Sequence, residues 1–294
     1  MTTIDSKYLE LVYLINKEGE ILEGRNGNTK TLVDEFPQIK WDLSEDAFPI
    51  LSIRKQNLLH YINEFLWEVN GGYNVYDLDN VYAPVDSSFL WNTWATEDGS
   101  IPYSYGSCWR NNGELTAKYS VDQLRIIEDE LIRCSETNSR SRRLTLITQD
   151  VMKNAITAVG GWKNAPKQVP PCHPCIQFTL SKDKLNAHVF SRSQDIVVGF
   201  PGDAIRYSLL TMCLAKMIDI KPGKVCFSFS DVHYYMEHED KLNKILDDFE
   251  PSLDNYPLLS IDGYKGKRLS EYKWQDFELS HYVPSKFYSF PLIA

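Results

Sequence analysis

Apolar residues are spaced along this chain in two ways, and the first is helical. Where they recur three and four positions apart, they form one face of an amphipathic helix. This spacing predicts helices over residues 5–17, 55–70, 121–134 and 204–219, and a further helix that runs to about residue 248. Asp5 or Ser6 is the expected N-cap of the first helix, and Asn70 and Gly71 are expected to end the second.

The second kind of spacing is typical of strands. Apolar residues alternate with others at Ile176, Phe178 and Leu180, and short apolar runs cover residues 144–148 and 225–230. Lys221-Pro222-Gly223 is expected to end the preceding helix, residues 24–29 to form a turn, and the aromatic segment 82–110 to be a loop. Helices mixed with strands predict an α/β fold. Without an internal repeat or flexible linker, residues 1–294 are expected to form a single catalytic domain.

Composition narrows the class of protein. The chain has 31 basic and 40 acidic residues, a net charge of −9, which argues against non-specific binding to nucleic acid or to an anionic membrane. No run of about 18 or more apolar residues is present, and the N-terminus lacks a basic flank followed by an apolar segment. We therefore expect a cytoplasmic protein that binds neither membrane nor nucleic acid, with its six cysteines as free thiols.

Cys172 is the strongest candidate for chemistry. It lies between Pro171 and His173, just before the expected strand at 176–180, on a turn that the adjacent prolines stiffen. A thiol presented in this way at the end of a strand is suited to act as a nucleophile. Arg192 and Asp203 follow in the next segments and would supply an anion site and a hydrogen-bonding carboxylate.

Two other uses of these cysteines are disfavoured. Cys172 and Cys175 form a C-x-x-C pattern, but a redox motif of this kind precedes a helix in a small βαβ domain, whereas here it precedes a strand. A zinc site would need a second pair of ligands, and His233 and His238 alone do not complete one, so no metal is expected. Strand alternation turns Cys175 to a different environment, where a packed thiol is the expectation.

Two charged positions keep two interpretations each. Glu64 lies in a strongly apolar helix beside Phe65 and Trp67, so it is either at the solvent edge or a buried carboxyl with a shifted pKa. Arg142 and Arg143 precede the strand at 144–148, where they are either a solvated charge run or a phosphate clamp.

Several short motifs together resemble the thymidylate synthase family, including its pyrimidine nucleotide hydroxymethylase branch. They are residues 25–29, 63–67 and 91–94, Tyr105-Gly106, Trp109-Arg110, Ser141-Arg142-Arg143, Pro171-Cys172-His173, Arg192-Ser193-Gln194-Asp195, Gly199-Phe200-Pro201-Gly202-Asp203 and residues 231–235. They occur in the family's order and spacing from about Tyr8 to the C-terminus. The resemblance implies a mixed β-sheet flanked by helices, and a homodimer formed through one face of that sheet. It also implies a pyrimidine nucleoside monophosphate as substrate and 5,10-methylenetetrahydrofolate as co-substrate.

The resemblance implies a role for each matching residue. The implied catalytic residues are the nucleophile, which adds to C6 of the pyrimidine, and its neighbours: Cys172, Glu64, Tyr105, His173 and Asp203. Phosphate would be bound by Arg25, Arg192 and Ser193 of one subunit and by Arg142 and Arg143 of the other. His233 and Tyr235 are implied to bind the sugar. The folate would be bound by Asp195, Trp91, Arg54 and Ala294, the last within a C-terminal tail that closes over the site.

Asp203 is the most informative departure from the family. Thymidylate synthases have Pro-Phe-Asn where this chain has Pro201-Gly202-Asp203, and their asparagine bonds the O4 and N3–H edge of uracil. A carboxylate only accepts hydrogen bonds, so Asp203 would repel O4 but could accept from the 4-amino group of cytosine and from protonated N3. Asp203 therefore predicts selection of cytosine, as in the deoxycytidylate hydroxymethylases of phages. A helix N-cap is the competing interpretation.

The predicted reaction converts dCMP, 5,10-methylenetetrahydrofolate and water to 5-hydroxymethyl-dCMP and tetrahydrofolate. Gly202 in place of phenylalanine could admit the water, and Ser191 in place of a frequent glutamine could change the local polarity. Ser193 and Arg143 favour dCMP over CMP. Hydride transfer giving 5-methyl-dCMP, CMP hydroxymethylation and thymidylate synthesis from dUMP remain alternatives. A non-catalytic nucleotide- or RNA-binding protein is disfavoured because Cys172 and the residues expected to support it are all present. If the protein is phage-encoded, it would act in the host cytoplasm.

Overall fold

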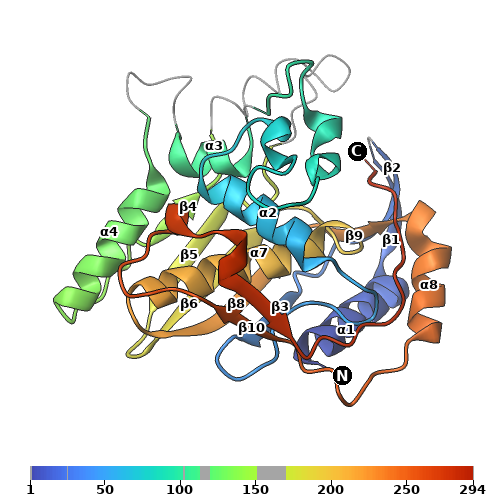
Figure 1. Ribbon diagram of the computed structural model, residues 1–294. Coiled ribbons are helices and arrows are strands. Elements are labelled where there is room, and N and C mark those ends of the chain that lie inside the picture. Colours follow the sequence, from blue (N-terminus) through green and yellow to red (C-terminus); the bar gives the residue numbers. More distant parts are fainter. Residues whose placement is uncertain (1, 25, 102, 113–119, 151–169, 294) are drawn as a thin grey trace.

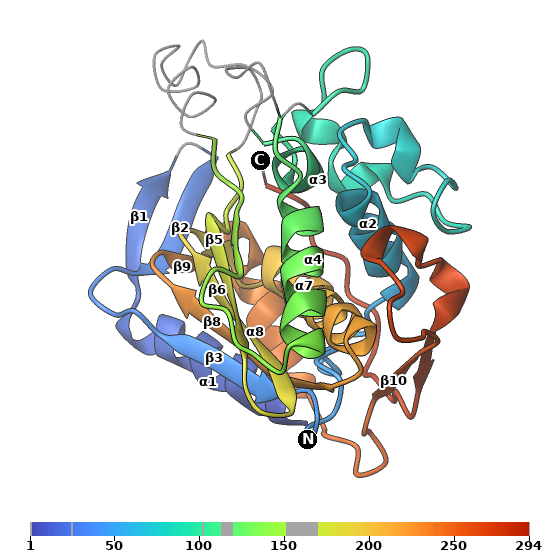
Figure 2. The same ribbon diagram turned by 90° about the vertical axis from the view of Figure 1, so that its left-hand side faces the viewer.

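The structure is a computed structural model that describes residues 2–24, 26–101, 103–112, 120–150 and 170–293. The strands of the two larger sheets lie on one side of the molecule, and α2, α4 and α7 lie on the other together with the hairpin that contains β10 (Figure 1, Figure 2). The α-helices are α1 (Thr3–Glu18), α2 (Leu58–Val69), α3 (Tyr105–Arg110), α4 (Gln123–Glu136), α7 (Gly199–Met217) and α8 (Glu239–Asp248). Short 3-10 helices cover Val75–Leu78, Ser88–Leu90, Asn92–Trp94, Met236–His238, Leu269–Glu271 and Trp274–Asp276.

The largest sheet has five strands and is mixed. Its order is β3 (Gln38–Asp42), β8 (Lys221–Phe229), β6 (Lys184–Ser191), β5 (Cys175–Leu180) and β4 (Thr145–Ile147). Only the β6–β8 pair in this sheet is parallel. A mixed sheet with helices beside it confirms the predicted α/β fold class.

A second sheet continues from the first. Its order is β1 (Glu20–Gly24), β2 (Gly27–Leu32), β9 (Val232–Tyr235) and β7 (Gln194–Asp195). β6 leads into β7 through residues 192–193, and β8 leads into β9 through residues 230–231, so two neighbouring strands pass from one sheet to the other. A separate hairpin pairs β10 (Leu258–Ile261) with β11 (Phe277–Ser280).

Helix α7 is buried on nearly every side, since only Met212 and Lys216 among its residues after Gly199 are not buried. One side packs on β6 and β8 and another on α2, so α7 is the layer between the sheet and α2 (Figure 2). Phe227 of β8 lies at the centre of this packing, with ring centroids 5.7 Å from Phe200 and 5.5 Å from Tyr207.

Most predicted helices and strands are present, and four local expectations are wrong. Thr2, and neither Asp5 nor Ser6, caps α1, because the Thr2 side chain accepts a hydrogen bond from the Asp5 amide. Residues 105–110, expected in a loop, form helix α3, which Ser104 caps. α7 begins at Gly199, earlier than expected. Residues 221–223 belong to strand β8, where Lys221 pairs with Lys184, so they do not form the turn that ends α7.

The packing around Phe227 predicts a large loss of stability on truncation. Phe227→Ala should lower the free energy of unfolding by about 3–5 kcal/mol, because it removes a fully buried ring and leaves a cavity. Urea unfolding followed by circular dichroism measures the change. Lys224→Ala, at an exposed position of the same strand, is the control and should change the free energy by less than about 0.5 kcal/mol.

Candidate active site

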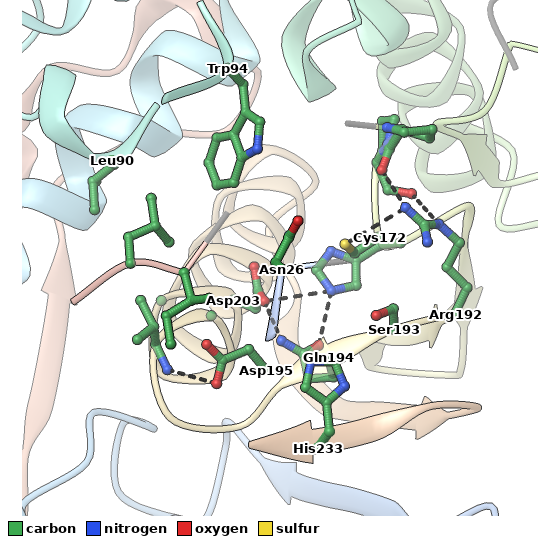
Figure 3. A pocket seen from close by; sticks show the side chains of 18 of the residues that line it. Asn26, Leu90, Trp94, Cys172, Arg192, Ser193, Gln194, Asp195, Asp203 and His233 are labelled. Atoms are coloured by element: carbon green, nitrogen blue, oxygen red, sulfur yellow. Dashed lines mark hydrogen bonds and ion pairs between the residues drawn. The ribbon is translucent and has the colours of Figure 1, made fainter. Parts of the chain in front are cut away.

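Most of the residues expected in a site line one cavity of about 830 Å³. The cavity lies where β6 and β8 pass into β7 and β9. Helices α2 and α3 and the first turns of α7 border it (Figure 3). The expected residues that line it are Cys172, His173, Glu64, Tyr105, Asp203, Arg192, Ser193, His233, Tyr235, Asp195 and Trp91.

Cys172 lies just before β5, and its surroundings fix its position. Its backbone amide donates a hydrogen bond to Tyr105 Oη at 2.8 Å, and its carbonyl accepts one from the Arg192 amide at 2.9 Å. The guanidinium of Arg192 lies 4.0 Å from Cys172 Sγ (Figure 3). Burial raises the pKa of the Cys172 thiol, and the charge of Arg192 offsets only part of that rise.

Arg192 is oriented by the turn that carries Cys172. Its Nε donates to the carbonyl of Pro171 at 3.1 Å, and its Nη2 donates to the carbonyl of Pro170 at 2.5 Å. The two carbonyls therefore hold the guanidinium beside the thiol, and Ser193, next in the chain, lines the same cavity. A fixed arginine next to a serine hydroxyl is a suitable site for a phosphate group.

A chain of hydrogen bonds connects Tyr105 with Asp203 through His173 and Gln194. Tyr105 Oη lies 3.0 Å from His173 Nδ1, and His173 Nε2 lies 3.2 Å from Gln194 Oε1. Gln194 Nε2 donates to Asp203 Oδ2 at 2.7 Å. Because a carboxylate accepts only, this donation fixes the orientation of the Gln194 amide, and His173 Nε2 is the donor to Gln194. Burial lowers the pKa of His173, which keeps the ring neutral.

Asp203 lies in the first turns of α7 but does not cap it. The N-cap is Val198, and the carboxylate of Asp203 instead pairs with the side chains of Gln194 and Arg206. The N-cap interpretation of this aspartate is therefore wrong. Burial alone would raise the pKa of Asp203, but the charge of His173 when that ring is protonated, the charge of Arg206 and the hydrogen bonds from Gln194 and Arg206 together lower it below its usual value. The carboxyl group is thus ionised at neutral pH.

Arg206 joins Asp203 to two carboxylates of α2. It forms ion pairs with Asp203 and Glu68, and its Nη1 lies 3.4 Å from Glu64 Oε1. Glu64 also accepts a hydrogen bond from Trp91 Nε1 at 2.7 Å. Glu64 is buried, so the solvent-edge interpretation is wrong. Burial raises the pKa of Glu64 despite the charge of Arg206 and the hydrogen bond from Trp91.

Gln194, Glu68 and Arg206 were not expected in the site. The four-residue spacing of Glu64 and Glu68 places both carboxylates on one face of a helix, and Arg206 follows Asp203 by about one turn. These spacings are a signal in the sequence for paired charges. Nothing in the sequence indicated that α2 would lie against α7 and bring these charges together.

The strands of the second sheet carry the residues expected at the sugar and folate. His233 and Tyr235 lie on β9 and both line the cavity, with ring centroids 5.5 Å apart. His233 Nδ1 lies 2.6 Å from Asp231 Oδ1, which orients the ring. Asp195 Oδ1 accepts from the amides of Val197 and Val198 at 2.8 and 3.2 Å, so the segment that leads into α7 fixes this carboxylate.

The C-terminal tail forms part of the cavity wall. Leu292 and Ile293 line the cavity, and the ring of Phe290 lies 4.9 Å from the guanidinium carbon of Arg54. His238 Nε2 lies 3.0 Å from the carbonyl of Pro291. Arg54 is buried and does not itself line the cavity. Its guanidinium donates a hydrogen bond to the carbonyl of Val197. Arg25 and Ala294, also expected in the site, lie outside the described residues.

Three further expectations concern the Arg142–Arg143 pair, Gly202 and Ser191. Arg142 and Arg143 are exposed before β4 and do not line the cavity of their own chain. A Cβ at Gly202 would lie 2.7 Å from Tyr61 Cε1, so the Tyr61 ring already fills the space that Gly202 was expected to open for water. Ser191 is buried and donates to Gln194 Oε1 at 3.1 Å, which places it behind the hydrogen-bond chain.

Comparison with known proteins identifies the family. The family model described as "Thymidylate synthase" matches residues 6–294. The chain belongs to the thymidylate synthase family. The thymidylate synthase of Francisella philomiragia subsp. philomiragia is 29% identical over 280 residues, 94% of this chain and 95% of that protein. The thymidylate synthase of Francisella tularensis subsp. holarctica is 28% identical over the same coverage.

Membership of the thymidylate synthase family defines the general chemistry. The family consists of folate-dependent one-carbon transferases that bind a pyrimidine nucleotide and use 5,10-methylenetetrahydrofolate as co-substrate. The cavity provides a thiol, a fixed arginine and several polar side chains, which suits a nucleotide. In the described part of the chain, no helix is long and apolar enough to cross a membrane.

The contact between Arg192 and Cys172 predicts the pH dependence of thiol reactivity. Thiolate forms as the pH rises through the pKa of Cys172, so Arg192→Met should raise that pKa further and move the alkylation profile to higher pH. Iodoacetamide labelling of Cys172, followed by peptide mass spectrometry from pH 6 to about 10, measures the profile. Arg192→Lys keeps a cation and should shift the profile less. Equal profiles for all three proteins would contradict this role of Arg192.

Proposed function

We propose that this protein is a deoxycytidylate 5-hydroxymethyltransferase. It would convert dCMP, 5,10-methylenetetrahydrofolate and water to 5-hydroxymethyl-dCMP and tetrahydrofolate. The observation that carries the proposal is Asp203, a buried carboxylate that faces the same cavity as Cys172 and has its pKa lowered. The base specificity and the hydroxymethyl product go beyond what membership of the family establishes.

The base specificity follows from what Asp203 can accept. Cytosine has an amino group at C4, and its N3 also becomes a donor when protonated, so an ionised Asp203 can accept from both. Uracil has a carbonyl oxygen at C4, and a carboxylate opposite that oxygen would leave a buried charge facing a lone pair. Such a mismatch costs a few kcal/mol, which corresponds to about 10²-fold or more in selectivity.

The reaction would begin with addition of the Cys172 thiolate to C6 of dCMP. N3 takes up a proton from solvent as the thiolate adds, and Asp203 would accept hydrogen bonds from N3–H and the 4-amino group. C5 becomes nucleophilic and attacks the methylene carbon of the folate. C5 then loses its proton, tetrahydrofolate leaves, and water adds to the exocyclic methylene. Departure of Cys172 from C6 releases the product. Arg192 and Ser193 would hold the phosphate, and His233 and Tyr235 the sugar.

Glu64 and Tyr105 would assist proton transfer beside the base. The raised pKa of Glu64 makes its protonated form more accessible than that of an ordinary glutamate, and Trp91 fixes the direction of its carboxyl group. Tyr105 connects the backbone at Cys172 with the neutral His173 ring, so it supports the thiol on one side and the hydrogen-bond chain on the other. On the folate side, Asp195 and Trp91 would bind the pterin, and Leu292 and Ile293 would cover it.

Thymidylate synthesis from dUMP is the second candidate. The relatives named above are thymidylate synthases, and the whole catalytic set around Cys172 is compatible with that reaction as well. The ionised Asp203 is the observation against it. Capture of water, in preference to hydride, rests on the resemblance to cytosine-specific hydroxymethylases, since Tyr61 already occupies the space beside Gly202.

Product analysis separates these candidates. The protein is incubated with 5,10-methylenetetrahydrofolate and with dCMP, CMP or dUMP, and the nucleotides are analysed by mass spectrometry. We expect a gain of about 30 Da on dCMP, because one CH₂O is added, and no product with Cys172→Ser. A gain of about 14 Da on dCMP would replace water capture by hydride transfer, and turnover of dUMP alone would refute the role of Asp203.

We further propose that the protein acts as a homodimer in which each subunit completes its partner's site. One face of the five-stranded sheet packs on α7, while the opposite face carries Phe190, 44% exposed, next to His188 and Cys175. A partner on this face would cover an apolar ring that is otherwise exposed to water. Arg142 and Arg143, at the edge of this sheet, would then reach the partner's phosphate site.

Subunit complementation tests this arrangement. Cys172→Ser and Arg143→Ala should each reduce activity strongly as separate homodimers. If Arg143 serves the partner's site, each mixed dimer contains one site with both residues intact. The two variants are mixed after mild denaturation, and product formation is measured. The mixture should recover up to about a quarter of the wild-type activity. Activity that stays at the level of the separate variants would contradict a shared site. A protein that sediments as a monomer would also contradict it.

A further inference from the structure

We propose that Arg206, anchored by Glu68, is a positioning residue that determines which base Asp203 can bind. The inference rests on the proposed cytosine specificity and assigns its control to two residues outside the expected site. The geometry that supports it is a buried row of charges that extends from the cavity into the contact between α7 and α2.

The guanidinium of Arg206 is held from three sides. Its Nη2 pairs with Asp203 Oδ1, and its Nη1 pairs with Glu68 Oε1. The side chains of Arg206, Asp203 and Glu68 are 8%, 7% and 0% exposed. The guanidinium carbon also lies 5.3 Å from the centre of the Tyr105 ring, which covers one face. Arg206 itself lines the cavity, and its guanidinium cannot move away from Asp203 without breaking a buried ion pair.

These contacts fix the plane of the Asp203 carboxylate. Arg206 occupies one acceptor position of Oδ1, and Gln194 occupies one of Oδ2 at 2.7 Å. Each carboxylate oxygen can accept a second hydrogen bond. Asp203 thus presents two acceptors and no donor to a base in the cavity, which matches the 4-amino group and protonated N3 of cytosine.

The charge of Arg206 keeps Asp203 in this accepting form. The other titratable groups around Asp203 are Cys172, His173, Glu64, Glu68, Tyr61, Tyr105 and Tyr207. Burial keeps the His173 ring neutral, and the two glutamates, where ionised, would repel a charge on Asp203. Without Arg206, only the hydrogen bond from Gln194 and the contact with His173, 3.6 Å away, would oppose the effect of burial, so the pKa of Asp203 should rise. A protonated carboxyl group donates as well as accepts, so it could also pair with O4 of uracil.

The ion pair between Glu68 and Arg206 contributes little to the stability of the fold. Burying a glutamate and an arginine costs desolvation free energy that their attraction repays only when the remaining polar atoms are bonded. Here Glu68 Oε2 and Arg206 Nε are buried without a hydrogen-bond partner among the described residues. Two apolar residues of similar volume would serve packing at least as well. The pair is better explained as the anchor that directs the other end of Arg206 at Asp203.

The test compares binding of dCMP and dUMP across pH. Dissociation constants of both nucleotides are measured by isothermal titration calorimetry from pH 5.5 to 9 for the wild type and Arg206→Met. The nucleotides carry the same phosphate, so its titration cancels in the ratio of the two constants. In the wild type we expect dCMP to bind more tightly than dUMP at every pH in this range. In Arg206→Met the preference should fall by about tenfold or more at low pH and return as the pH rises above the raised pKa of Asp203.

Further variants make the result specific. Arg206→Lys keeps a cation and should keep most of the preference, while Glu128→Gln, which removes a buried carboxyl group paired with Arg110 and Arg268, should leave the ratio unchanged. If Arg206→Met does not fold, the double variant Glu68→Met/Arg206→Met removes the charge without leaving Glu68 unpaired. It should show the same pH-dependent loss of preference.

Asp203→Asn separates failure of this inference from failure of the proposed function. An amide both donates and accepts at every pH, so this variant should lose the preference for dCMP across the whole range. If Asp203→Asn leaves the base preference unchanged, Asp203 does not select the base and the proposed cytosine specificity fails. If Asp203→Asn shifts the preference but the Arg206 variants keep the wild-type ratio at every pH, the function stands and the role of Arg206 is refuted.

Discussion

The ion pair between Arg206 and Asp203 is the interaction on which the arrangement of the site depends. Both residues lie on α7, which is buried between the sheet and α2, and charges in such a place must be paired. α2 supplies the partners Glu64 and Glu68, so the same contact that closes the core also forms the end of the cavity. Packing of α7 and the proposed recognition of the base therefore depend on the same residues.

The strands define the other half of the cavity. β6 and β8 are neighbours in one sheet, and their continuations β7 and β9 are neighbours in the next. The short connections between them place Arg192, Ser193 and Asp231 side by side at the edge of the cavity. Gln194 N donates to the Asp231 carbonyl at 2.7 Å, which keeps the two connections in register. Backbone pairing thus sets the distance between the thiol and the groups expected to bind phosphate and sugar.

The sequence allowed most of the helices, the strands β4, β5 and β8, and Cys172 to be predicted, because these depend on local spacing and on one stiff turn. It did not reveal helix α3 or the remaining strands, the central strand β6 among them, because their residues have no pattern that separates them from loops. Gln194, Glu68 and Arg206 were missed because their importance comes from contacts between elements far apart in the chain. The same reason explains Tyr61, which fills the space beside Gly202.

The C-terminal tail has a consequence for handling the protein. Phe290 is held between Arg54, Lys241 and His238, and the residues after it line the cavity, whereas the N-terminus lies at the opposite end of the molecule (Figure 1). A purification tag or fusion partner appended after Ala294 would extend from the wall of the cavity itself. An extension before Met1 would emerge far from it, so the N-terminus is the position that leaves the chemistry accessible.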